Sequence, residues 1–212
     1  MKRQLLIFDL DGTLIDSRQD LCTGINLMRR HYKLPPLPAD TISSFIGDGV
    51  RNLVKRSLEG RSIDIDEAVR INSEAYLRHI HDKTVLYHGV AEGLPALFNH
   101  GHKLALISNK GADGCKIILN YFNIINFFSS IIGGDSDLPM KPAPETVHET
   151  MRRANSIAAD TWIIGDNHTD LAAARNANVK SIFVTYGIGK TFREKASHNF
   201  DDFTALTQYF LN

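Results

Sequence analysis

Short apolar runs separated by longer patterns of helical spacing indicate the architecture of this chain. A strand buried in a parallel sheet appears as a continuous apolar run rather than an alternating one. Strands that alternate with helices build a parallel sheet covered on both faces, so we predict a Rossmann-like α/β core of three layers. The expected strands are Leu5–Phe8, Lys103–Ile107, Ser130–Ile132, Thr161–Ile164 and Lys180–Val184, and the expected helices are Val90–Asn99, Gly111–Phe122, Pro144–Ala154 and Asp170–Ala177.

The interval from Ile15 to Leu86 departs from this alternation. Its apolar spacing indicates helices and no convincing strand, with a Pro-rich joint at Leu34–Pro38. An all-helical insertion after the first strand would lie over the edge of the sheet as a cap; the alternative is a helical elaboration with no role in binding. We predict a catalytic core of residues 1–14 and 86–212 and a helical cap of residues 15–85. The helices expected in the cap include Gln19–Tyr32, Val50–Leu58 and Asp66–His79.

The charge and the cysteines exclude several classes of partner. Lys plus Arg and Asp plus Glu each total 24, so no basic excess attracts nucleic acid or an anionic membrane. No apolar run approaches the roughly 20 residues of a membrane span. Cys22 and Cys115 lack CxxC spacing; they can form one bridge, but two free thiols in a cytoplasmic protein are the better prediction.

Two acids directly follow the first expected strand. Asp9 and Asp11 are two positions apart, and strand residues at that spacing point the same way, so both carboxylates can reach one site. Gly12 then allows a backbone conformation that is closed to most residues. Taken alone, such a pair is more typical of a turn or a helix cap.

Polar residues also follow three other expected strands. Each group alone is consistent with a turn and a helix cap, as for Ser108 or Asn109, and Asp170 stands where an acid favours a helix start. The carboxyl ends of parallel strands share one edge of a sheet, however, and ligands bind there. The groups are Ser108-Asn109-Lys110, Gly133-Gly134-Asp135 followed by Lys141–Pro144, and Gly165–Asp170.

The combined set indicates phosphoryl transfer. Clustered carboxylates raise one another's pKa unless a cation neutralises them. Oxygen ligands in an open site favour Mg²⁺, which commonly binds one or two carboxylates and a substrate phosphate. Ser108, backbone amides and Lys141 are suitable donors to phosphate oxygens. By contrast, Gly187–Lys190 lacks the full phosphate-loop pattern and is predicted to be a turn.

At this point the chain closely resembles the haloacid dehalogenase-like (HAD) phosphohydrolases. The four motifs of that family occur here in order and at matching spacing, and the resemblance covers essentially the whole chain. The motifs are DxDGT at Asp9–Thr13, a strand-ending serine at Ser108, a lysine in a KPxP context at Lys141–Pro144, and GDxxxD at Gly165–Asp170.

The resemblance implies a role for each residue. Asp9 would attack phosphorus and form an aspartyl-phosphate. Asp11 would protonate the leaving alkoxide and then deprotonate the hydrolytic water. Mg²⁺ would be held by the Asp9 carboxylate, the Asp11 carbonyl and Asp166.

The resemblance also implies how the phosphoryl group is bound. Ser108, the amide of Asn109 and Lys141 would bind it and offset its charge. Asp170 would orient a metal-bound water or Lys141. The cap would close to exclude water and open to release product.

Within that superfamily the chain is most similar to the phosphoglycolate phosphatases with a helical cap, which implies 2-phosphoglycolate as substrate. The segments that carry this similarity are Phe45–Leu58, Ser108–Lys110 and Ile132–Pro142. Arg51 or Arg56 could pair with the substrate carboxylate, with Arg51 favoured by its place beside the Gly47–Gly49 loop. The alternative is that both arginines lie on a solvated helix face.

Other activities on the same framework stay open. They are β-phosphoglucomutase, inorganic pyrophosphatase, and nucleotide or sugar-phosphate phosphatase, and the sequence does not decide between mutase and phosphatase. A non-catalytic binding module is disfavoured because Asp9, Asp11, Lys141 and Asp166 are all present. The expected partner is a small phosphorylated metabolite, and the expected state is a monomer or weak homodimer.

Overall fold

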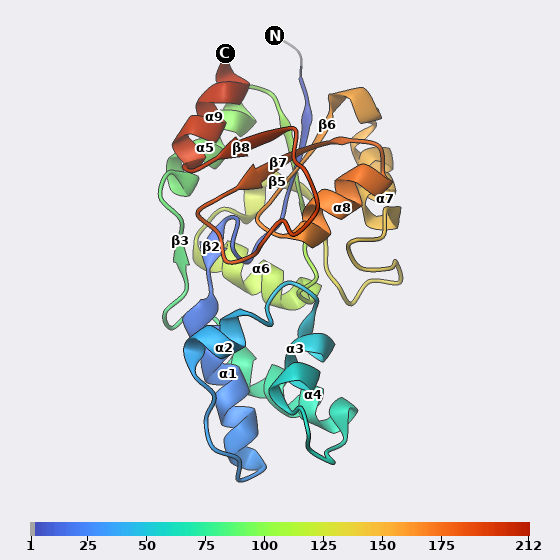
Figure 1. Ribbon diagram of the computed structural model, residues 1–212. Coiled ribbons are helices and arrows are strands. Elements are labelled where there is room, and N and C mark those ends of the chain that lie inside the picture. Colours follow the sequence, from blue (N-terminus) through green and yellow to red (C-terminus); the bar gives the residue numbers. More distant parts are fainter. Residues whose placement is uncertain (1–2) are drawn as a thin grey trace.

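A six-stranded parallel sheet forms the centre of the computed structural model, which describes residues 3–212 (Figure 1). Residues 1 and 2 of the expected core lie outside the described residues. The strand order is β5-β4-β1-β6-β7-β8, so the first strand of the chain is central. The strands are β1 (Leu5–Phe8), β4 (Lys103–Ile107), β5 (Phe128–Ile132), β6 (Thr161–Gly165), β7 (Lys180–Val184) and β8 (His198–Phe200).

Strand β1 shows why both faces of the sheet are apolar. Leu6 and Phe8 face one hydrophobic cluster, and Leu5 and Ile7 face the other. Successive side chains of a strand point to opposite faces, so four apolar residues in a row require cover on both sides. The first cluster includes residues of α5 (Val90–Asn99), α6 (Ala112–Tyr121) and α9 (Phe203–Leu211), and the second includes residues of α7 (Glu145–Ala154) and α8 (His168–Asn176).

The predicted three-layer α/β fold is therefore confirmed, and the observed elements match the expected ones closely. Strand β8 was not predicted, because its three residues are polar at two positions and lie at the edge of the sheet. Two short 3₁₀ helices, Ile125–Phe127 and Ala158–Asp160, precede β5 and β6. Across residues 3–212, no helix is long and apolar enough to cross a membrane.

Four helices of the insertion lie together below the sheet in Figure 1. The prediction that residues 15–86 contain no strand was wrong at both ends of the interval. Two-residue strands pair antiparallel there, and they are too short to show a periodic pattern. The elements are β2 (Ile15–Asp16), α1 (Arg18–His31), α2 (Ala39–Ser43), α3 (Val50–Ser57), α4 (Ile65–Leu77) and β3 (Val85–Leu86).

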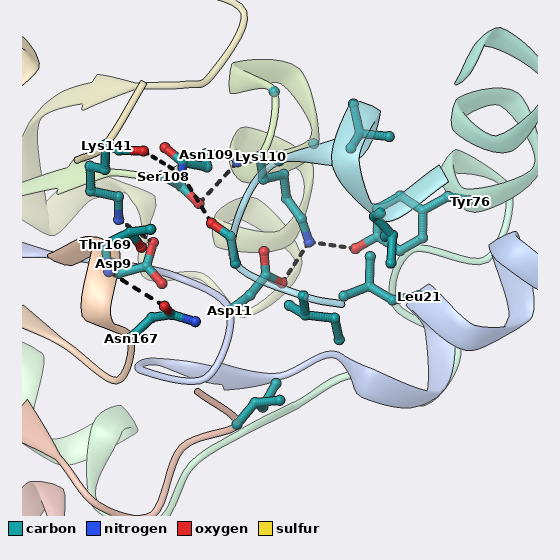
Figure 2. A pocket seen from close by; sticks show the side chains of 18 of the residues that line it. Asp9, Asp11, Leu21, Tyr76, Ser108, Asn109, Lys110, Lys141, Asn167 and Thr169 are labelled. Carbon is teal, nitrogen blue, oxygen red and sulfur yellow. Dashed lines mark hydrogen bonds and ion pairs between the residues drawn. The ribbon is translucent and has the colours of Figure 1, made fainter. Parts of the chain in front are cut away.

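Helices α1 and α4 pack closely at a glycine. A Cβ atom at Gly24 would lie 3.0 Å from Cβ of Tyr76. The absence of a side chain at Gly24 therefore lets the two helices approach there, and it fixes the position of Tyr76. This residue is buried and points toward the edge of the sheet that carries Asp9 and Asp11 (Figure 2).

Candidate active site

A cavity of about 360 Å³ lies between the carboxyl edge of the sheet and the helices of the insertion. Figure 2 shows polar side chains from the strand ends on one side of it and side chains of the insertion on the other. The core lines the cavity with Asp9, Asp11, Ser108, Asn109, Lys110, Lys141, Asp166 and others, whereas the insertion contributes mainly apolar residues, among them Leu21, Ile46, Val50, Leu53 and Leu77.

Lys141 links two of the predicted carboxylates. Its Nζ donates to Asp9 Oδ1 at 2.7 Å, to Asp170 Oδ1 at 2.6 Å and to the carbonyl of Ile107 at 2.9 Å. All three side chains are buried. Burial lowers the pKa of Lys141, but the carboxylates of Asp170 and Asp9 raise it by more, so the ammonium stays charged. A fixed positive charge therefore lies beside the Asp9 carboxylate.

Asp166 is held by backbone amides from a distant loop. Its Oδ2 accepts from the N–H groups of Ile188 and Gly189, both at 2.7 Å, and its Oδ1 accepts from the Thr13 hydroxyl at 3.4 Å. The sequence predicted only a turn at Gly187–Lys190, whereas the structure wraps this loop around Asp166. No local pattern signals such a contact, because it depends on the two loops meeting at the edge of the sheet.

Two glycines make room for the Asp166 side chain. A Cβ atom at Gly12 would lie 2.0 Å from Asp166 Oδ2, and one at Gly187 would lie 2.2 Å from Asp166 Cβ. Gly12 also has a φ of +89°, a conformation that other residues rarely adopt. Both positions therefore require glycine if Asp166 is to face Asp9.

Three buried carboxylates offer oxygen ligands to one cation. Oxygen atoms of Asp9, Asp166 and Asp170 lie within 4.8 Å of one another. Burial raises the pKa of Asp166 to about 8, and the nearby Asp9 and Asp170 contribute. Burial likewise raises the pKa of Asp9 to about 6, against the opposing effect of Lys141. One ammonium does not balance three carboxylates, so this donor set fits a divalent cation with oxygen ligands.

Asp170 has both of the roles that the sequence allowed, as a helix-capping residue and as a partner of Lys141. Its Oδ2 accepts from the Asn167 N–H at 3.0 Å and completes a capping box at the start of α8. Its Oδ1 accepts from Lys141. The helix start therefore fixes the carboxylate that positions the lysine.

The Asp11 side chain has partners that the sequence did not predict. Its Oδ1 accepts from Lys110 Nζ at 2.6 Å and also from the Ser17 hydroxyl. Lys110 Nζ donates in addition to the hydroxyl of Tyr76 at 2.6 Å (Figure 2). The sequence identifies Lys110 only as part of the Ser108–Lys110 motif, and it does not indicate that Tyr76 reaches this lysine.

Ser108 and Asn109 are buried beside the cavity. Asn109 Nδ2 donates to the carbonyls of Gly47 and Lys141, both at 3.0 Å, and so joins the insertion to the core. The Ser108 hydroxyl accepts from the Lys110 N–H at 3.3 Å. Both predicted phosphate-binding positions therefore lie at the same edge of the sheet as Asp9.

The structure does not bring Arg51 to the cavity. Its guanidinium pairs with Asp66 on α4, and 62% of its side chain is exposed. Arg56 pairs with Asp48 at 2.5 Å and is also solvated. Helix α3 turns Leu53, Val54 and Ser57 inward, which leaves Arg51 on the outer face, as the solvated-face alternative supposed.

Comparisons with known proteins agree with this geometry. A family model described as haloacid dehalogenase-like hydrolase matches residues 6–184. The phosphoglycolate phosphatase of Psychrobacter arcticus is 38% identical, over 100% of this chain and 97% of that protein. The one of Colwellia psychrerythraea is 36% identical, over 88% and 86%. The crystal structure of a predicted phosphoglycolate phosphatase from Haemophilus somnus superposes with a TM-score of 0.93 at 27% identity, over 99% of this chain and 98% of that one.

Proposed function

The chain belongs to the haloacid dehalogenase-like hydrolases, and we propose that it hydrolyses 2-phosphoglycolate to glycolate and phosphate through a phosphorylated Asp9. Phosphoric monoester hydrolysis is the activity that the family and the relatives indicate. The observation that carries the proposal is the contact of Lys141 with both Asp9 and Asp170 beside the cavity. A charged lysine at that place attracts a phosphoryl group to the nucleophile.

In the proposed first step, an Asp9 oxygen attacks phosphorus and the bond to the leaving oxygen breaks. Asp11 gives its proton to that oxygen, so the alcohol leaves neutral at this atom. In the second step, Asp11 takes a proton from water, the water oxygen attacks phosphorus, and the bond between phosphorus and Asp9 breaks. The products are the alcohol and inorganic phosphate, and both aspartates return to their initial states.

The remaining residues of the site would bind and orient. Mg²⁺, when bound by the Asp9 and Asp166 carboxylates and the Asp11 carbonyl, supplies positive charge to the phosphoryl oxygens. Ser108, the Asn109 amide and Lys141 would contact the same group. Asp170 would hold Lys141 in place through the contact of 2.6 Å.

The nucleophile is tested by Asp9→Asn. We expect turnover to fall roughly a thousandfold or more and no phosphoenzyme to form, because an amide does not displace the leaving group. Circular dichroism should show an unchanged fold.

A second test concerns the metal. Chelation of Mg²⁺ with EDTA should inactivate the wild-type enzyme, and added Mg²⁺ should restore its activity. Full activity of Asp9→Asn contradicts the nucleophile, and indifference to EDTA contradicts the metal.

A second candidate is a larger monoester, such as a sugar phosphate or a nucleotide. One observation favours it: the cavity of about 360 Å³ and its apolar wall offer more room than glycolate fills. A panel of esters with Mg²⁺ decides between the candidates by kcat/KM, with pyrophosphate and β-glucose 1-phosphate included and the products identified by NMR. Another ester preferred by about tenfold, or about 1.4 kcal/mol, contradicts 2-phosphoglycolate but not the class of reaction.

We also propose that residues 15–85 act as a cap on a core of residues 1–14 and 86–212. The β2–β3 pair at both ends of the insertion and the position of its helices over the cavity support this division. We further propose that the enzyme acts in the cytoplasm on a small phosphorylated metabolite, as a monomer or weak homodimer. In support, Cys22 and Cys115 are both free thiols.

A further inference from the structure

Lys110 is a cation of the cavity that the proposed reaction does not use. Only 9% of its side chain is exposed, and its Nζ contacts Asp11 Oδ1 and the Tyr76 hydroxyl. Among the described residues that line the cavity, the cations are Lys141 and Lys110. Lys141 is already bound to Asp9 and Asp170. Lys110 is therefore the cation that remains for the part of the substrate beyond the phosphoryl group.

The position of Lys110 matches the leaving group. Its Nζ lies 2.6 Å from Asp11 Oδ1, the carboxyl that would protonate the leaving oxygen. A group two bonds beyond that oxygen would therefore be within reach of the ammonium. An ammonium has three donors, and the hydrogen bonds to Asp11 and Tyr76 use two of them, so one remains for a ligand.

An anionic leaving group in this cavity needs Lys110 as its counter-charge, because acidic side chains surround it. Asp113 and Asp135 also line the cavity, and each would repel an anion. Moving an anion out of water is costly unless a counter-charge and hydrogen bonds meet it. Arg51 and Arg56, the cations suggested by the sequence, do not line the cavity.

Tyr76 completes the arrangement from the insertion. It is buried on α4, and its hydroxyl oxygen accepts from Lys110, which leaves its own proton to donate. Burial raises the pKa of Tyr76 to about 12, so the phenol keeps that proton at neutral pH. A carboxylate that contacts both Lys110 Nζ and the Tyr76 hydroxyl would meet one donor from the core and one from the insertion (Figure 2).

We propose that Lys110 and Tyr76 bind a carboxylate of the leaving group, so that the cavity selects monoesters whose alcohol carries this acid. The inference rests on the proposed phosphatase function and names the residues that determine its substrate. Because Lys110 also touches Asp11, a loss of activity alone would not distinguish substrate recognition from support of Asp11. Two matched substrates make that distinction.

The test compares 2-phosphoglycolate with 2-hydroxyethyl phosphate, which carries a hydroxymethyl group in place of the carboxylate. In Lys110→Met we expect kcat/KM to fall about a hundredfold for 2-phosphoglycolate and less than about tenfold for the ester without a carboxylate. Lys110→Arg should restore part of the preference, since it returns the charge. Tyr76→Phe should lose several-fold on 2-phosphoglycolate only.

The control is Lys195→Met, at an exposed lysine that does not line the cavity, which should change the kcat/KM of neither ester. Equal losses on both esters in Lys110→Met overturn the inference and assign Lys110 a role through Asp11 alone. No preference for 2-phosphoglycolate in the wild-type enzyme also overturns it and leaves the phosphatase function standing. If Lys110→Met does not fold, Lys110→Arg and Tyr76→Phe give the same comparison.

The same two esters also show whether the proposed phosphatase function itself fails. If the wild-type protein with Mg²⁺ hydrolyses neither ester, calorimetric binding of both compounds to wild type and to Lys110→Met replaces the kinetics. Tighter binding of 2-phosphoglycolate than of 2-hydroxyethyl phosphate, lost in Lys110→Met, would support the carboxylate site without the reaction. Equal binding of the two compounds would overturn the site as well.

Discussion

Asp166 accepts hydrogen bonds from protein donors, and no cation among residues 3–212 forms an ion pair with it. Two backbone amides reach its Oδ2, yet burial and the carboxylates of Asp9 and Asp170 still raise its pKa to about 8. At neutral pH the metal-free protein therefore either keeps a proton there or holds an unpaired charge. Both states destabilise the fold, and a bound cation would remove this destabilisation.

We expect Asp166→Asn to stabilise the metal-free protein, on the order of 2 kcal/mol at pH 7, because an amide at this position needs neither the proton nor the unpaired charge that Asp166 must hold there. Mg²⁺ should stabilise the wild-type protein by binding it, and it should not stabilise Asp166→Asn. Urea unfolding in EDTA and in Mg²⁺ measures both effects. Asp113→Asn, at a side chain that is 90% exposed, is the control and should change stability by less than about 0.5 kcal/mol. A less stable Asp166→Asn protein in EDTA contradicts this account.

The raised pKa values of Asp166 and Asp9 also set the pH dependence of metal binding. In the metal-free fold their pKa values of about 8 and about 6 exceed the unfolded value of 3.8. Their contribution to stability is thus fully present below pH of about 4 and is lost as the pH rises through 6 to 8. Mg²⁺ binds the deprotonated form, so the rise in Tm that it causes should grow between pH 5 and pH 8. A rise in Tm that does not change with pH would contradict the raised values.

The sequence predicted the residues that directly follow strands and missed those that reach the site from elsewhere. Asp9, Asp11 and Asp166 follow apolar runs, and the parallel arrangement brings them to one edge. Tyr76 reaches that edge only because α4 packs on α1, which no local pattern encodes. Arg51 is close to the Gly47–Gly49 loop along the chain, as expected. Which face of α3 points inward, however, depends on the elements that pack against this helix.

At the scale of elements, the two-residue strands β2 and β3 join the insertion to the core. Hydrogen bonds to Asp20 connect the segment after β2 with the segment before β3. Asp20 lies in the first turn of α1, directly after β2, and is 1% exposed. Its carboxylate accepts from the Lys83 N–H at 2.9 Å, the Thr84 N–H at 2.8 Å and the Thr84 hydroxyl at 2.7 Å, just before β3. Such short strands have too few ladder bonds to be stable alone.

Asp20→Ala should therefore destabilise the protein by on the order of 3 kcal/mol, because the Lys83 and Thr84 amides and the Thr84 hydroxyl lose a carboxylate acceptor. Asp20→Asn should cost less, since the amide oxygen still accepts. Urea unfolding measures the change. Asp40→Ala is a matched control, since Asp40 is also in the first turn of a helix but is exposed, and a cost below about 1 kcal/mol is expected. Equal costs at the two positions would show that Asp20 acts only on its helix.

The elements of the core were predictable because each is long enough to show its period. Strand β1 has four apolar residues in a row, and Val90–Asn99 was predicted with the bounds that α5 has in the structure. Strands β2, β3 and β8 were not predicted, because two or three residues show no period and the partner strand, rather than the local sequence, makes them strands.

At the scale of the whole molecule, the cavity belongs to neither part alone. The Gly47 carbonyl accepts from Asn109, Tyr76 accepts from Lys110 and the Ser17 hydroxyl donates to Asp11, so the insertion makes polar contacts with the strand ends. On the core side, the loop that holds Asp166 also lines the cavity through Ile188 and Gly189. A ligand in the cavity therefore touches both parts, and its binding should order both.

We expect Mg²⁺ with inorganic phosphate to slow amide hydrogen exchange both in residues 46–50 of the insertion and at Ile188 and Gly189 of the core, by about fivefold or more. Helix α9 packs on α5, contributes no residue to the cavity, and should exchange at an unchanged rate. Mass spectrometry of peptides over minutes to hours reports these openings. Protection confined to Ile188 and Gly189 would mean that phosphate binds without the insertion, and residues 15–85 would then not act as a cap.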